Sequence, residues 1–197
     1  MIDHYRTLAT IAESRQKIER SEFLGIAFPV ETDDAFFAEL ALLTKRHFDA
    51  THLCWAYRLF LNAEVRTRSA DAGEPSGTAG KPILSAIDGA GLHDVAVIVV
   101  RWYGGVKLGT GGLSRAYRRT AVETLRAATL SDRYVYKRFR IGVPFDQLGV
   151  IYRLIDAPDV ILVAEHFGDT NEFELDVRLG LAEKFALTLA EKRLILR

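Results

Sequence analysis

VAVIVV (Val95–Val100) is an unbroken run of apolar, mostly β-branched residues near the middle of the chain. A strand with one face in water alternates apolar and polar residues, so a continuous apolar run is typical of a strand covered on both faces. We therefore place this strand at the centre of a sheet. Two glycine-rich segments flank it, DAGEPSGTAGKPIL (Asp71–Leu84) before it and WYGGVKLGTGGL (Trp102–Leu113) after it. Their composition predicts loops on both sides of the central strand.

The N-terminal part of the chain predicts one strand, one helix and a second strand. Residues 5–29 alternate loosely and end at a proline, which is typical of a strand. Thr32 predicts the N-cap of a helix whose apolar residues recur at helical spacing. LCWAYRLFL (Leu53–Leu61) is aromatic and apolar enough for the second strand, and a polar turn region follows it. Pro82 then fits the first turn of a short helix that Gly89 and Gly91 end.

The C-terminal part predicts a second domain. The second loop leads into a helix from about Leu113 to Ala128, with an apolar stripe on one side and arginines on the other. LSDRYVYKR (residues 130–138) indicates a break. From Tyr134 to Arg197 the expected order is strand, helix, strand, strand, helix, strand, which is the ferredoxin-like arrangement. The sequence therefore predicts an α+β protein with two domains, residues 1–130 and residues 134–197.

Charge is balanced over the whole chain but not within one segment. Because 26 basic residues stand against 26 acidic ones, the net charge gives no reason to expect nucleic acid or a membrane as partner. Residues 101–126 differ, since six basic residues stand there against Glu123 alone, an excess of five positive charges. The segment predicts a local surface for an anion or a nucleic acid. Trp102 and Tyr103 are the neighbouring aromatic residues that could stack on bases.

The standard phosphate-binding motifs are absent from both loops. A Walker A loop needs Ser or Thr after Gly-Lys, but Pro82 follows Gly80-Lys81, and a dinucleotide fingerprint fails at Ser114, where its third glycine belongs. A more general anion site remains, because glycines lead into a helix whose first amides and positive dipole end face the loop. The simpler interpretation is that these glycines supply turns and the arginines form a solvated helix face. The candidate anion- or nucleic-acid-binding residues are Lys81, Arg101, Lys107, Gly109, Gly111, Gly112, Arg115, Arg118 and Arg119.

The first loop also contains residue types that catalyse reactions elsewhere. Ser76 and Lys81 offer a nucleophile and a base, and Glu74 offers a general base. No histidine or second carboxylate stands at a matching spacing, and turn chemistry accounts for each residue. His52 and Cys54 share a strand face, but a zinc deaminase needs a later pair of cysteines and the chain has one. We therefore expect a noncatalytic protein with no metal and no cofactor.

The cysteine content and hydropathy predict a location. A single cysteine excludes an internal disulfide and favours a reducing, cytoplasmic compartment. The first twenty residues carry charges throughout, so they do not form a signal peptide. No apolar run approaches the ~18 residues that a membrane helix needs, so we expect no membrane partner.

Three motifs together resemble a known family. GEPSGTAGKPIL, VVRWYGGVKLGTGGLSRAYRRTAVETL and the upstream ATHLCWAYRL are similar to the signature segments of the IMPACT/YigZ family. The similarity covers about residues 18–128, and the chain beyond residue 134 looks like the small C-terminal domain of bacterial members. The resemblance implies an N-terminal fold related to domain IV of elongation factor G, with a left-handed βαβ unit, and a tail similar to domain V of that factor.

The resemblance also implies which residues form the presented surface. Within the first loop these are Gly73, Glu74, Pro75, Ser76, Gly77, Thr78 and Gly80, and after the central strand they are Gly104, Gly105 and the second loop. We expect the two loops to lie side by side on one rim of the sheet. The resulting hypothesis is a noncatalytic protein that binds RNA or the ribosome in the regulation of translation. An enzyme acting on a small phosphorylated or nucleotide ligand, and a module that binds a protein partner, are the alternatives.

Overall fold

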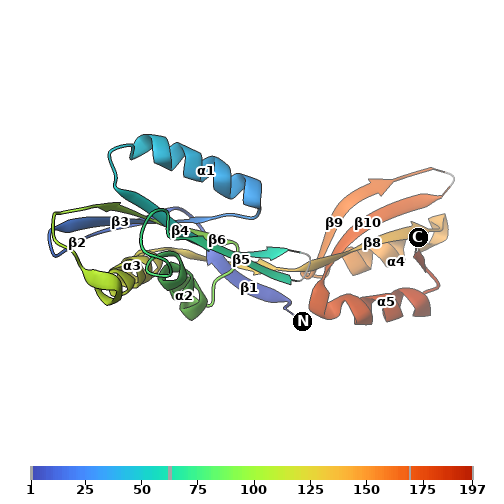
Figure 1. The fold of residues 1–197 in the computed structure, drawn as a ribbon. Helices are drawn as coiled ribbons and strands as arrows, with labels where there is room; N and C mark the ends of the chain where they lie inside the picture. The colour runs from blue at the N-terminus through green and yellow to red at the C-terminus, as the bar shows by residue number, and fades with distance from the viewer. Residues whose placement is uncertain (1, 62–63, 169, 197) are drawn as a thin grey trace. The chain divides into compact units, whose positions relative to one another are not determined.

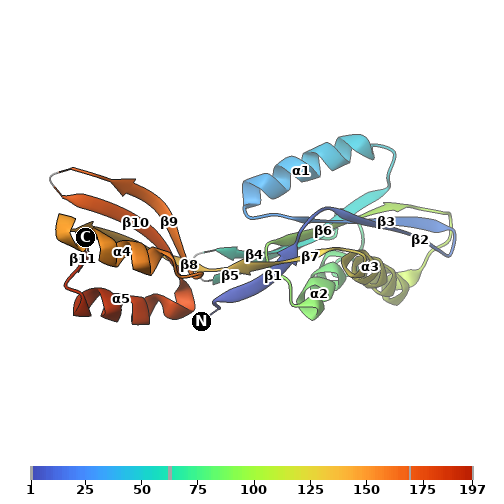
Figure 2. The same ribbon diagram turned by 180° about the vertical axis from the view of Figure 1, so that it is seen from behind.

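The computed structural model describes residues 2–61, 64–168 and 170–196. The chain divides into two compact units. One unit is Tyr5–Arg133, and the other joins the residues up to His4 with those from Tyr134 onward. The first few residues, which we had assigned to the N-terminal domain, therefore cluster with the C-terminal one. Figures 1 and 2 show the helices and strands of each unit from two sides.

The larger unit contains a five-stranded antiparallel sheet with strand order β2-β3-β6-β4-β5. The strands are β2 (Ala12–Ile18), β3 (Ser21–Pro29), β4 (His52–Leu61), β5 (Glu64–Ala70) and β6 (Val95–Trp102). The central position of β6 confirms the expectation from its apolar run, and its residues from Val95 to Arg101 are all buried. A strand in that place must be apolar on both sides, because helices cover both faces of the sheet.

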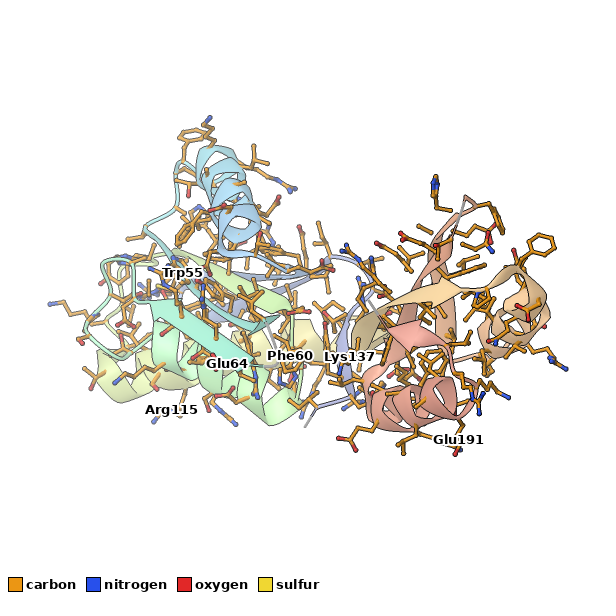
Figure 3. All side chains as sticks on the ribbon, turned by 90° about the vertical axis from the view of Figure 1, so that its right-hand side faces the viewer. Trp55, Phe60, Glu64, Arg115, Lys137 and Glu191 are labelled. Carbon is orange, nitrogen blue, oxygen red and sulfur yellow. The ribbon has the colours of Figure 1, made fainter. Side chains whose placement is uncertain are left out.

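The helices divide between the two faces, as Figure 1 shows. Helix α1 (Asp33–Arg46) covers one face, and Figure 3 shows Trp55 near it, in agreement with the 4.8 Å between the ring centroids of Trp55 and Phe36. Helices α2 (Gly80–Ala90) and α3 (Gly109–Arg126) cover the other face. Alternate β6 residues therefore enter separate cores. Val95, Val97 and Val99 pack with α2 and α3, and Ala96, Ile98 and Val100 pack with the α1 side.

The local signals for the helix ends are confirmed at α1 and α2. The Thr32 hydroxyl oxygen accepts a hydrogen bond from the Ala35 amide at 3.1 Å, as an N-cap does. Helix α2 ends at Gly91, whose φ of 64° is the left-handed conformation that favours glycine at this position.

Several strands were missed in the sequence. Three strands precede α1 instead of one, because β1 (His4–Leu8) and β2 come before β3. The polar turn region after β4 is the edge strand β5, and the expected break after α3 contains β7 (Leu130–Tyr134), which pairs with β1. Strand β5 is exposed along most of its length. Edge strands carry charges because these discourage pairing with other chains, and the charges hide the alternation that would reveal a strand.

The turn between β2 and β3 is unusually tight for its sequence. Ile18 pairs with Ser21, so Glu19 and Arg20 alone form the turn, and their φ values are 51° and 75°. Glycine or asparagine normally occupies such a turn, because a Cβ disfavours positive φ. The turn lies against the loop after β6, where a Cβ added to Gly104 would lie 1.9 Å from the carbonyl oxygen of Arg20. Glycine is therefore required at position 104.

The smaller unit has the predicted order of six elements. These are β8 (Tyr136–Val143), α4 (Leu148–Ile155), β9 (Val160–His166), β10 (Asn171–Arg178), α5 (Ala182–Glu191) and β11 (Ile195–Leu196), with short 3-10 turns at Phe145–Gln147 and Leu179–Leu181. The strands form an antiparallel sheet of order β11-β8-β10-β9. Its core includes Phe139, Phe173 and Leu175 packed against helix residues such as Phe185 and Leu189. Within the described ranges of the chain, no helix has both the length and the apolar character needed to span a membrane.

Two glycines in α2 give a matched test of this packing. A Cβ at Gly80 would lie 2.8 Å from the Ala70 nitrogen, whereas a Cβ at Gly89 would meet nothing within 4 Å. We expect Gly80→Ala to lower the free energy of unfolding by about 1–3 kcal/mol, because the helix must move away from β5. Gly89→Ala should raise it by up to about 1 kcal/mol, because alanine favours a helix more than glycine does. Urea denaturation followed by circular dichroism measures both, and equal effects would contradict the contact.

Candidate functional site

One rim of the five-stranded sheet brings the two glycine-rich segments together. The pairs Trp55–Ala70, His52–Arg101 and Trp102–Glu22 place the start of β4, the ends of β5 and β6 and the start of β3 at the same rim. The loop between β5 and α2 and the loop between β6 and α3 both leave from there. The β2–β3 turn lies at that rim as well.

Asp71 organises the first loop. Its carboxylate accepts hydrogen bonds from the amides of Gly77, Ala79 and Gly80 at 2.8 to 2.9 Å. Burial alone would raise the pKa of Asp71, but these three amides and the charge of Lys81 outweigh burial and hold the pKa below its ordinary value. The loop therefore folds around one ionised carboxylate, which we had not singled out in the sequence.

Glu74 occupies the centre of a buried polar cluster. Its side chain is 4% exposed, and its Oε1 lies 2.6 Å from Nη1 of Arg101, whose side chain is 5% exposed. The Tyr117 hydroxyl of α3 donates a hydrogen bond to the same oxygen at 2.7 Å, and Nε2 of His52 lies 4.0 Å from Oε2. This cluster joins the first loop to the end of β6 and to α3. With these partners the Glu74 carboxylate is not placed to act as a general base toward a ligand.

Arg101 must be removed from the predicted anion surface. The residue is 4% exposed, and besides Glu74 its guanidinium donates to the Ser21 hydroxyl oxygen at 3.2 Å. Charge counting along the sequence included Arg101 because such counting carries no information on burial. The positive charge is neutralised inside the fold by Glu74.

Cys54 and His52 contact backbone carbonyl groups of the first loop. The thiol of Cys54 is fully buried and donates to the carbonyl oxygen of Asp71 at 2.9 Å, and burial raises its pKa to about 12. Nδ1 of His52 lies 2.9 Å from the carbonyl oxygen of Ala72. The start of β4 thus carries a buried cysteine beside a hydrogen-bonded histidine. A thiol with so high a pKa is a poor nucleophile.

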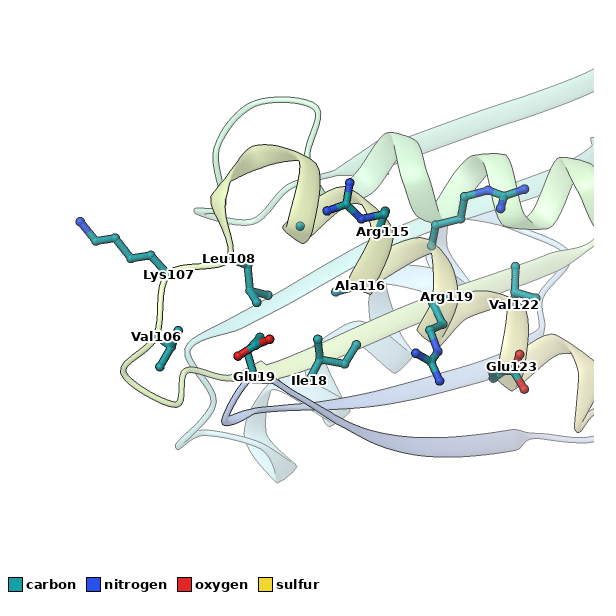
Figure 4. Close-up of a pocket in the computed structure, with 12 residues that line it drawn as sticks. Ile18, Glu19, Val106, Lys107, Leu108, Arg115, Ala116, Arg119, Val122 and Glu123 are labelled. Carbon is teal, nitrogen blue, oxygen red and sulfur yellow. The ribbon is translucent and has the colours of Figure 1, made fainter.

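A groove lies beside α3 (Figure 4). Its volume is about 830 Å³. We call it the α3 groove. It lies between the β2–β3 turn, the loop after β6 and helix α3, and it is lined by Ile18, Glu19, Val106, Lys107, Leu108, Gly112, Arg115, Ala116, Arg118, Arg119, Val122 and Glu123. The groove thus combines an aliphatic lining with several charged side chains.

The glycines of the second loop lie inside the helix and not before it. Helix α3 begins at Gly109, four residues earlier than expected, so Gly109, Gly111 and Gly112 form its first turn. No side chain caps this turn and no acidic residue lies in it. A Cβ added to Gly111 would lie 3.4 Å from Nη1 of Arg115, so that guanidinium lies beside the first turn. The positive end of the helix dipole and a guanidinium therefore lie together at one end of the groove.

The cations of the groove are available to a ligand. Lys107, Arg115, Arg118 and Arg119 are exposed, and none forms an ion pair with any residue that the structure describes. Of the two acidic residues in the lining, Glu123 is already paired with Arg126 at 2.9 Å. Figure 4 shows Lys107 extending outward from the loop, and Arg115 and Arg119 extending from different sides of α3. Among the described residues, the groove lining therefore has four cations without an ion-pair partner and one such carboxylate, that of Glu19.

The structure brings together most of the predicted anion-binding residues. Lys107, Gly112, Arg115, Arg118 and Arg119 line the groove, and Gly109 and Gly111 belong to the adjoining helix turn. Lys81 is exposed on α2 near Asp71 and does not line the groove. No local pattern predicted the opposite side of the groove, to which Ile18 and Glu19 contribute.

The lowered pKa of Asp71 makes the stability of the protein depend on pH. Its folded pKa lies below its ordinary value of 3.8, so its stabilisation is fully present above the unfolded pKa and is lost as pH falls through the folded pKa. We expect Asp71→Asn to lower the free energy of unfolding by about 2 kcal/mol at pH 7. Urea denaturation at pH values from 7 to 2 should show the difference between the two proteins shrinking below about pH 4. A difference independent of pH would contradict the assignment.

The buried cluster leads to a second prediction. Glu74→Ala leaves the Arg101 guanidinium buried without its carboxylate, so we expect a loss of about 3–5 kcal/mol in the free energy of unfolding. Ser76→Ala in the same loop is the control, because Ser76 is exposed and its removal should change stability by less than about 0.5 kcal/mol. Chemical denaturation compares the two variants. A Glu74→Ala protein as stable as the control would show that the ion pair does not hold the loop.

Comparisons with known proteins show the family to which the chain belongs. Residues 19–125 match the family model described as the Impact N-terminal domain. The IMPACT family member YvyE of Bacillus subtilis is 32% identical over 191 residues, which cover 97% of this chain and 88% of the relative. An IMPACT family member of Thermus thermophilus is 42% identical over 140 residues, or 71% of this chain and 74% of that protein. A crystal structure described as that of a hypothetical protein is 26% identical, with a TM-score of 0.74, and covers 100% of this chain and 97% of the other. This chain belongs to the IMPACT family.

Proposed function

We propose that this protein is a noncatalytic RNA-binding protein that acts on the ribosome in the regulation of translation. The observation that carries the proposal is the α3 groove, which is lined by four exposed cations without ion-pair partners among the described residues and lies along a helix with an uncapped N-terminus. Phosphate groups of an RNA backbone suit such a surface, because each can be held by a cation or by helix amides. A function of this kind belongs in the cytoplasm.

The positive field near α3 depends on where the charged residues lie and not on the net charge of the chain. The chain as a whole is neutral, with 26 basic and 26 acidic residues. Much of the remaining charge is paired on the surface, as in Arg138 with Glu174 and Asp176, or Arg66 with Asp33. The cations of the α3 groove are therefore the source of a local positive field, which attracts polyanions at moderate salt.

The fold supports a place in translation. In the larger unit β3 and β4 run parallel on either side of β6 and are joined through α1, which is compatible with the βαβ unit of elongation factor G domain IV. In the smaller unit the strand order β11-β8-β10-β9 supports the ferredoxin-like arrangement and the likeness to domain V. Both assignments are part of the proposal.

An enzymatic function receives less support from the site. The enzyme hypothesis relied on Glu74 and Lys81. Glu74 is bound to Arg101 and Tyr117, and Lys81 lies outside the α3 groove. The groove lining provides cations and aliphatic side chains, and a binding role uses both.

Charge reversal on α3 tests the proposal. We expect the purified protein to bind a fluorescent single-stranded RNA and to cosediment with ribosomes, with affinity that falls steeply with salt. Arg115→Glu and Arg119→Glu should each weaken binding and reduce the slope of log K against log salt concentration by about 1, because each removes a phosphate contact. Fluorescence anisotropy across a salt series measures the slope.

A variant on the opposite face is the matched control. Lys45→Glu makes the same change of charge at an exposed residue of α1, on the other face of the sheet from α3. It should leave both the affinity and the slope nearly unchanged. If the wild-type protein bound neither RNA nor ribosomes, or if all three variants weakened binding equally, the α3 groove would not be the RNA-binding surface.

A further inference from the structure

Tyr103 presents an exposed aromatic ring next to a buried cation. The residue follows β6 and is 45% exposed. The Cζ atom of Arg101 lies over its ring at 5.4 Å from the centroid, and it lies at the same distance over the ring of buried Phe23. The Arg101 guanidinium therefore contacts one exposed ring and one core ring.

An ion pair and hydrogen bonds hold Arg101 and the backbone around Tyr103 in place. Arg101 is held by Glu74 at 2.6 Å and by the Ser21 hydroxyl at 3.2 Å. The Tyr103 amide donates to the hydroxyl oxygen of Thr51 at 3.0 Å, and the Gly104 amide donates to that of Ser21 at 3.2 Å. The backbone around the ring is thus bound to β3 and to the start of β4. A ligand that stacks on Tyr103 would meet a ring whose position is already set.

The ring also lies close to the α3 groove along the chain. Tyr103 begins the loop that brings Val106, Lys107 and Leu108 to the groove. Lys107 is four positions after Tyr103, so their Cα atoms are at most about 14 Å apart. One short nucleotide strand can therefore reach the ring with a base and Lys107 with a phosphate.

We propose that Tyr103 stacks on an unpaired base, so that this surface binds single-stranded RNA in preference to duplex RNA. The inference rests on the proposed function and adds to it the class of RNA. Bases in a duplex are already stacked on each other, whereas an unpaired base is free to stack on an aromatic side chain. The lining of the α3 groove contains no aromatic residue, so the groove supplies charge and aliphatic contacts. Tyr103 supplies the stacking contact beside it.

The experiment compares three variants at one position. Tyr103→Ala and Tyr103→Leu remove the aromatic ring, and Tyr103→Phe keeps it. Anisotropy titrations use a fluorescent single-stranded RNA of about twelve nucleotides and a blunt duplex of the same sequence. We expect Tyr103→Ala and Tyr103→Leu to weaken single-strand binding about 5- to 100-fold with an unchanged salt slope. Tyr103→Phe should bind like the wild type, and duplex binding should not change in any variant.

The outcomes separate this inference from the proposed function. If Tyr103→Leu bound the single strand as tightly as the wild type while Arg119→Glu still weakened binding, stacking would be overturned and the α3 groove would stand. If the wild-type protein bound no RNA, the proposed function would fail and the stacking role with it. Equal weakening for single strand and duplex would also overturn the inference. Thermal denaturation confirms that each variant is folded, and Tyr103→Leu decides the question if Tyr103→Ala is unfolded.

Discussion

The buried ion pair between Glu74 and Arg101 is the contact on which the rim of the sheet depends. It connects the loop after β5 with the end of β6, and Tyr117 brings α3 to the same carboxylate oxygen. Removing either charge would leave the other buried and unpaired, which is far costlier than the pair itself is stabilising. The pair therefore fixes the arrangement of three segments that are distant in the sequence. The guanidinium of Arg101 also lies over the ring of Tyr103, so one residue belongs to the buried cluster and contacts the exposed surface.

The two glycine-rich loops have different roles. In the first loop two polar side chains bind the loop's own backbone: Asp71 accepts hydrogen bonds from three amides, and the Thr78 hydroxyl donates to the carbonyl oxygen of Pro75. The second segment has no side-chain cap at its helix and leaves its cations exposed. The first loop thus shapes the rim, and the second segment offers a surface for a ligand. Similar composition in the two segments concealed this difference, because glycine content does not distinguish a loop folded on itself from one that faces solvent.

The elements that were predicted correctly have local signals. The apolar run of β6, the N-cap at Thr32 and the stripes of α3 each follow from residues near one another in the chain. Strand β5 was missed because an exposed, charged edge strand lacks apolar alternation, and β7 was missed because its partner β1 is more than a hundred residues away. The error at Arg101 has a related cause, since burial depends on strand order. The cations of α3 were predicted as a group because they share one helix, but their neighbours Ile18 and Glu19 come from a turn that no local pattern places beside α3.

The turn formed by Glu19 and Arg20 lies along one side of the α3 groove. Both residues hold a left-handed backbone, and the Arg20 carbonyl oxygen lies so close to Gly104 that the turn has no room to move toward the loop after β6. One side of the α3 groove is therefore preorganised by steric exclusion. The contact prevents the turn from closing toward the loop, so this side of the groove keeps its width without help from the charged side chains that line it.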